Sequence, residues 1–112
     1  MLIYVAGPFD MSNLWVIAES IRTVELAGLE IARRGHMPVI PHALSAKFDG
    51  ECDRRMWNIN LHHLLESCEA LLLLPNWQQN PFCIGEKQWA EEECHIPVYT
   101  SIESIPVIKF PD

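Results

Sequence analysis

Basic residues are scarce in this chain. Lysine and arginine together number 8, against 15 aspartates and glutamates, and the formal net charge at neutral pH is −7. Proteins that bind polynucleotides neutralise phosphates with clustered Lys and Arg side chains. We therefore expect no DNA or RNA partner. A small phosphorylated ligand remains compatible with this charge, because backbone amides at a helix N-terminus can hold a phosphate.

Long hydrophobic runs are also missing. The apolar runs at residues 1–9 and 70–75 are both much shorter than the roughly 20 residues that a membrane-spanning helix needs. The first residues lack the basic stretch and the cleavage site of a secretory signal. We therefore expect no membrane partner and a cytoplasmic location.

Cysteine pairs of the C-x-x-C type are absent. The cysteines are Cys52, Cys68, Cys83 and Cys94. In a cytoplasmic protein this pattern predicts reduced thiols that pack in the core rather than a disulfide framework. An activated thiol is the alternative for Cys83, which lies near an expected helix start. No obvious partner histidine accompanies it, which favours a packed thiol.

Metal and cofactor motifs are missing too. Two pairs of candidate ligands, at residues 62–63 and 94–95, are adjacent in sequence. Adjacent residues on a helix point about 100° apart, whereas zinc needs convergent ligands. The loop at residues 7–10 is neither G-x-G-x-x-G nor a Walker A motif, so neither a dinucleotide nor a nucleoside triphosphate is indicated. We expect no metal and no cofactor.

The chain does contain alternating strand and helix patterns. Strands are predicted at residues 2–6, 37–41, 69–75 and 97–100, with a further edge strand at 106–110, and helices at 13–34, 53–68 and 83–94. This order predicts an α/β fold. We expect a single Rossmann-like (flavodoxin-like) domain over residues 1–112, with a mainly parallel sheet of four or five strands and helices on both faces.

Start and stop signals bound the expected helices. Ser12 or Asn13 can cap the first helix, and Gly35 follows its basic last turn. Asp53 can cap the second helix. The strand at 69–75 is assigned from its length and its flanking residues, because leucine also favours helices.

Loops that follow parallel strands open at the same edge of the sheet. The loops at residues 7–10, 42–51 and 76–82 should therefore converge on one crevice. Gly7 lets the backbone come close to a ligand, and Pro8 stiffens the turn. A small-molecule site is predicted at this edge.

Glu86 is the carboxylate best placed for chemistry. It falls in the first turn of the expected third helix, where free amides and the macrodipole keep a carboxylate ionised. Helical spacing puts it on the side of Trp89 and Ala90, away from the solvated run at 91–93. It should lie near Asp10 and can act as a nucleophile. A helix N-terminal charge without further role is the alternative.

Other polar and aromatic side chains are candidates for ligand contact. Trp77 lies in a loop and can stack on a nucleobase, whereas Trp57 and Trp89 are expected in the core. Asn60 falls on or beside the buried face of the second helix and needs a partner or a ligand. His42 follows the second strand and either contacts a base or phosphate or has no role.

Four motifs recur in a set order along nearly the whole chain. They are residues 4–9 (YVAGPF), residues 35–42 (GHMPVIPH), residues 71–77 (LLLLPNW), and Glu86 followed by Ala90. In this order and spacing the chain resembles the nucleoside 2-deoxyribosyltransferase-like superfamily, and most closely its short, uncharacterised branch of phage and bacterial proteins.

This resemblance implies a reaction. In that family a helix-opening glutamate attacks the anomeric carbon of a deoxyribosyl nucleoside or nucleotide, and water or a second base resolves the glycosyl-enzyme intermediate. By position, Glu86 would be the nucleophile. The expected substrate contacts are Gly7, Pro8, Phe9, Asp10, His42, Trp77 and Asn80. The resemblance also implies a homo-oligomer, a dimer or larger.

Three positions depart from the family pattern. Asn60 stands where an aspartate commonly orients the nucleophile, Asn80 stands where relatives carry aspartate or serine, and Phe82 replaces a small residue. We expect cleavage or transfer at an N-glycosidic bond by Glu86, with Asn60 as its hydrogen-bonding partner. Because of these departures, the alternative is a catalytically inactive module that binds a nucleotide or a nucleotide-derived signal in the same pocket. A structural subunit with a vestigial pocket is a third interpretation.

Overall fold

A computed structural model describes residues 1–8, 13–41 and 53–109. The strands are β1 (Leu2–Ala6), β2 (Met37–Val39), β3 (Ala70–Leu73) and β4 (Val98–Tyr99), and the α-helices are α1 (Leu14–Arg33), α3 (Arg54–Glu66) and α4 (Pro81–Trp89). Short 3-10 turns are η2 (Trp77–Gln79) and η4 (Ile102–Ser104), and a π-helical turn, η3 (Ala90–Cys94), continues α4. The predicted alternation of strand and helix is confirmed.

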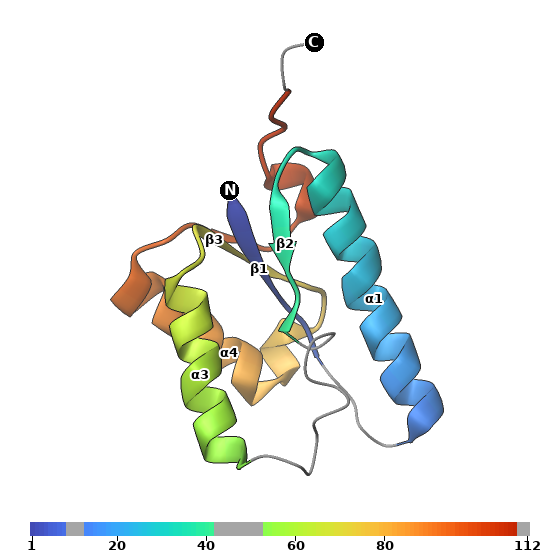
Figure 1. Cartoon of the computed structure of the whole chain (residues 1–112), viewed down its shortest axis with the longest axis vertical. Helices are drawn as coiled ribbons and strands as arrows, with labels where there is room; N and C mark the ends of the chain where they lie inside the picture. Colours follow the sequence, from blue (N-terminus) through green and yellow to red (C-terminus); the bar gives the residue numbers. More distant parts are fainter. Residues whose placement is uncertain (9–12, 42–52, 110–112) are drawn as a thin grey trace.

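The strands form one parallel sheet in the order β2-β1-β3-β4. The first strand is central, with Tyr4 opposite Val39 of β2 and Leu71 of β3. This is the strand order of flavodoxin-like folds as far as it extends. The predicted Rossmann-like α/β fold, with helices on both faces of a parallel sheet, is confirmed (Figure 1).

Successive residues of the central strands enter two different cores. Ile3 and Val5 pack with α1 and the segment around η4, whereas Tyr4 and Ala6 pack with α3 and α4. Figure 1 shows α1 on one side of the sheet and α3 with α4 on the other. Since both faces are covered, the buried strands are apolar along their whole length.

The boundaries differ from the prediction in several places. Strands β2, β3 and β4 are each shorter than the segments predicted for them. The described part of the predicted edge strand, residues 106–109, forms no strand. There the amide of Ile108 donates to the carbonyl of Arg34, just beyond α1, at 2.9 Å instead of joining the ladder. Helix α4 starts at Pro81, two residues before the predicted start.

A buried histidine ties the start of the chain to its C-terminal segment. The Nε2 of His36 lies 2.6 Å from the carbonyl oxygen of Pro106, and its Nδ1 lies 3.0 Å from the nitrogen of Met1. A carbonyl can only accept, so Nε2 donates and Nδ1 accepts. Within the described ranges, no helix is long and apolar enough to cross a bilayer.

Candidate active site

The start of α4 places Glu86. The side-chain oxygen of Asn80 accepts from the amides of Phe82 at 2.9 Å and Cys83 at 3.2 Å, and Pro81 occupies the first helical position. Glu86 therefore lies in the second turn of α4. The sequence predicted the first turn, so that prediction is wrong. The helix N-terminus is not what holds its charge, because the macrodipole effect falls off within the first turn.

The Glu86 carboxylate lies between α4 and the sheet. The hydroxyl of Tyr4, on the central strand, donates a hydrogen bond to it. Its Oε2 atom is buried and has no hydrogen-bond partner among the described residues. Burial raises the pKa of Glu86 above its usual value, while the Tyr4 hydrogen bond and the nearby His62 act in the opposite direction. Burial therefore shifts the pKa of this carboxylate opposite to the effect that the sequence attributed to the helix N-terminus.

Tyr4 carries the polar group that anchors this carboxylate. Its side chain is almost fully buried at the centre of the sheet. Burial, and then the charge of Glu86, raises the pKa of the Tyr4 phenol far above its usual range, so the hydroxyl stays protonated and donates. Sequence reasoning did not single out this residue. The available signal was a hydroxyl within a buried apolar strand, which needs a partner.

His62 and Trp89 complete the surroundings of Glu86. Nδ1 of His62 donates to the carbonyl of Asn58 at 2.8 Å, which orients the imidazole on α3. The ring meets Trp89 edge-on, with the ring centroids 4.9 Å apart. Trp89 Nε1 is buried without a hydrogen-bond partner among the described residues. The sequence suggested His62 only as a metal ligand, and it favoured a core position for Trp89 over stacking on a nucleobase.

Cys83 packs beside this site as an unreactive thiol. It is fully buried, and burial, followed by the charge of Glu86, raises its pKa to about 12. Burial likewise raises the pKa of Cys68 to about 11. The interpretation of Cys83 as a packed thiol is confirmed, because nucleophilic cysteines need a lowered pKa. Cys52 lies outside the described residues.

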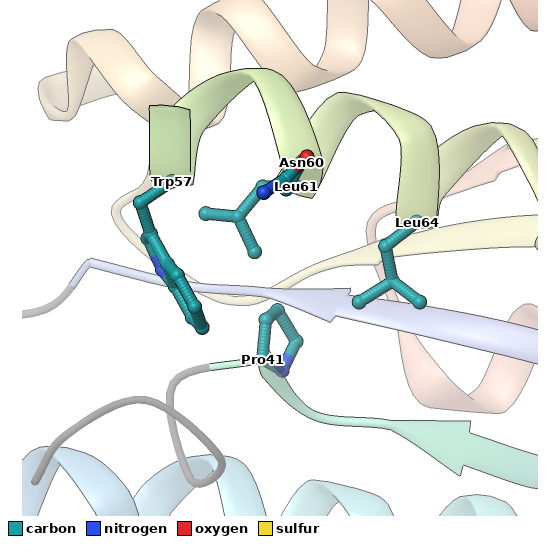
Figure 2. A pocket seen from close by; sticks show the side chains of 5 residues that line it. All are labelled: Pro41, Trp57, Asn60, Leu61 and Leu64. Carbon is teal, nitrogen blue, oxygen red and sulfur yellow. The ribbon is translucent and has the colours of Figure 1, made fainter. Parts of the chain in front are cut away.

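A separate small pocket lies against α3. It has a volume of about 130 Å³ and is lined by Pro41, Trp57, Asn60, Leu61 and Leu64. Figure 2 shows the side chains of Trp57 and Leu64 reaching from α3 toward Pro41, which follows β2. Asn60 is exposed at its rim, beside the buried face of α3 as predicted. Its contact with Glu86 stays a prediction.

Of the other predicted contacts, the structure describes Gly7 and Pro8. Gly7 is buried directly after β1, where a Cβ atom would lie 3.0 Å from Leu74, so its close approach in this structure is to a neighbouring strand end. Pro8 is exposed. Phe9, Asp10 and His42 lie outside the described residues. The expected proximity of Asp10 to Glu86 therefore stays a prediction.

Two further candidates have structural partners. Trp77 lies in η2, packs at the edge of the core under α4, and has the ammonium of Lys87 5.8 Å from its ring centroid. Asn80 caps α4, as described above. The roles of both residues in ligand binding stay predictions.

Neither the protein-family models nor the curated proteins contain a match to this chain. Over the described part of the chain, no group of three or more His, Cys, Asp or Glu side chains is arranged to hold a metal ion.

Proposed function

We propose that the protein cleaves or transfers the N-glycosidic bond of a nucleoside or a nucleoside 5′-monophosphate, with Glu86 as the nucleophile. The observation that carries this proposal is a carboxylate that is buried, anchored by Tyr4 and still has an unpartnered oxygen. A buried carboxyl group whose pKa is raised and that has a specific hydrogen-bond partner is a candidate for a catalytic role. The motif order that resembles the nucleoside 2-deoxyribosyltransferase-like superfamily supports the same assignment.

The reaction proceeds in two displacements. A carboxylate oxygen of Glu86 bonds to the anomeric carbon, and the carbon–nitrogen bond breaks with its electron pair going to the base. Water or a second base then attacks the same carbon, and the sugar–glutamate bond breaks. In hydrolysis, the proton that the water gives up balances the proton that the departing base gains.

Tyr4 acts on Glu86 as a positioning residue in this scheme. Its hydroxyl is protonated and sits on the rigid central strand, so it fixes the rotamer of the carboxylate. Removal of the carboxylate from water adds to its reactivity, because no hydration shell has to be displaced before attack. The proposal includes a cytoplasmic location, a small-molecule partner and no cofactor.

A non-catalytic nucleotide-binding module is the second candidate. One observation favours it: the Oε2 atom of Glu86 is shielded from solvent, whereas a nucleophile must reach its substrate. In this case the pocket holds a nucleotide or a nucleotide-derived signal, and the glycosidic bond stays intact.

One experiment separates the two candidates. The purified protein, the Glu86→Ala variant and the Glu92→Ala variant are incubated with ribo- and deoxyribonucleosides and their 5′-monophosphates, with and without an acceptor base. Free base is followed by chromatography. Glu92 is a matched control because it is exposed on the turn that continues α4. We expect base release or exchange by the wild type and Glu92→Ala, and none by Glu86→Ala. Binding without release by the folded wild type would establish the binding module instead.

A further inference from the structure

Two buried polar atoms of residues three apart on α4 both lack a hydrogen-bond partner within the described ranges. Glu86 Oε2 and Trp89 Nε1 are both buried, and neither has a hydrogen-bond partner among the described residues. Residues three apart on a helix have neighbouring side chains. Burial of such atoms is costly unless a partner satisfies them, so the pair marks a place where a polar group binds.

The two atoms have opposite hydrogen-bonding requirements. An indole N–H only donates, and an ionised carboxylate only accepts. A hydroxyl satisfies both at once, since it accepts from Trp89 and donates to Glu86. A carbonyl or an ether oxygen accepts but cannot donate, and a methylene group does neither.

Neighbouring side chains hold both atoms in place. Tyr4 anchors the Glu86 carboxylate from the sheet. The His62 imidazole packs edge-on against the Trp89 ring at 4.9 Å and is itself tied to the Asn58 carbonyl at 2.8 Å. A donor and an acceptor fixed by packing and hydrogen bonds have the rigidity that a recognition site needs.

We propose that Glu86 and Trp89 form a hydroxyl-binding subsite that recognises the 2′-hydroxyl of ribose. This inference rests on the proposed function. When one oxygen of the nucleophile bonds to the anomeric carbon, its other oxygen lies beside the hydroxyl of the adjacent carbon, a contact that strengthens in the transition state of glycoside cleavage. The substrate class is then the ribonucleosides or ribonucleotides, and 2′-deoxy compounds are poorer substrates.

The test compares matched sugars in matched variants. Base release is measured for a ribonucleoside, its 2′-deoxy form and its 2′-O-methyl form, each with the same base and 5′ group. The wild type is compared with Trp89→Phe, which keeps an aromatic ring but removes the N–H donor. Trp15→Phe is the control, because Trp15 is 75% exposed on α1.

We expect the wild type and Trp15→Phe to prefer ribose by about tenfold or more, the effect of one hydrogen bond to a charged group. Trp89→Phe should lose the part of this preference that the N–H donor supplies and keep the part that Glu86 supplies. Equal or better release from the 2′-deoxy compound by the wild type overturns the inference, and so does an unchanged preference in Trp89→Phe.

Binding measurements by calorimetry separate this inference from the proposed function. Ribose-selective binding that Trp89→Phe weakens, without any base release, would refute the reaction but keep the hydroxyl subsite. Base release without sugar preference would keep the reaction and refute the subsite. If Trp89→Phe does not fold, the wild type is tested with the 2′-O-methyl compound, whose ether oxygen cannot donate to Glu86. Weaker binding of this compound than of the ribonucleoside would support the subsite. Wild-type binding that is equal for all three sugars, or absent for all, overturns the subsite.

Discussion

Tyr4 and Glu86 bring a phenol and a carboxylate into an otherwise apolar layer between the sheet and α4. Their hydrogen bond satisfies the phenol but only one side of the carboxylate. A purely structural carboxylate at this depth would lower stability without compensation. The buried oxygen that lacks a partner among the described residues is therefore the feature of Glu86 that the proposed chemistry explains.

The pH dependence of stability should reveal this buried carboxylate. Burial raises the pKa of Glu86, so the folded state binds the proton more tightly than the unfolded chain. The resulting stabilisation is fully present below the ordinary glutamate pKa of about 4.3 and is lost as the pH rises through the folded-state pKa. Glu86→Gln carries no charge, so near neutral pH it should be more stable than the wild type.

The measurement is thermal unfolding followed by circular dichroism across this pH range. The advantage of Glu86→Gln should shrink as the solution is acidified toward the ordinary glutamate pKa. Glu92→Gln, at an exposed position, should show no such pH dependence. An advantage that stays constant with pH would contradict a buried, ionised Glu86.

Two glycines have opposite roles in the helices. One ends a helix where the backbone must turn, and the other lies inside a helix. Gly35, after α1, has a φ of 90° and a Cβ added there would lie 2.5 Å from the carbonyl oxygen of Ile108. Gly85 lies inside α4, where an added Cβ would meet no atom of the described residues within 4 Å. The first glycine is required by conformation and contact, whereas the second only weakens its helix.

Alanine substitutions should therefore shift stability in opposite directions. Gly35→Ala should lower the free energy of unfolding by more than about 1 kcal/mol, because alanine fits neither the backbone angle nor the space. Gly85→Ala should raise it by about 0.5–1 kcal/mol. Urea denaturation of the two variants beside the wild type checks this. A Gly35→Ala variant as stable as the wild type would show that the C-terminal segment does not pack against Gly35 as described.

At the scale of the whole molecule, the outer side of α1 exposes large apolar side chains. Trp15, Leu26 and Leu29 fall on one stripe of the helix, opposite the buried Val24 and Ile31. Grouped exposed apolar residues commonly mark an interaction surface. The surface is consistent with the homo-oligomer that the sequence resemblance implies, which stays a prediction.

Sedimentation velocity at micromolar concentration tests this prediction. We expect a dimer or a larger assembly for the wild type, and weaker association for Trp15→Glu, which places a charge on the stripe. Trp15 is largely exposed, so this variant should keep the fold, as circular dichroism would verify. A wild-type monomer under these conditions would contradict the prediction.

The periodicity of the sequence by itself determined the α/β fold. Strand and helix patterns alternate along the chain, and the caps at Asn13 and Asp53 are where the sequence placed them. These features are local, because capping and hydrophobic spacing act within a few residues. The start of α4 was misplaced because Asn80 and Pro81 were read as loop residues, although asparagine before proline is also a helix start.

The sequence also singled out Glu86, but only the tertiary structure decided what surrounds it. Tyr4, His62 and Trp89 come from β1, α3 and α4, which are distant in sequence and meet only when both helices pack on one face of the sheet. The pKa of the carboxylate likewise depends on the tertiary structure. Helix position is a local property and suggested an ionised group, whereas burial depends on the packing of the whole fold and raised the pKa.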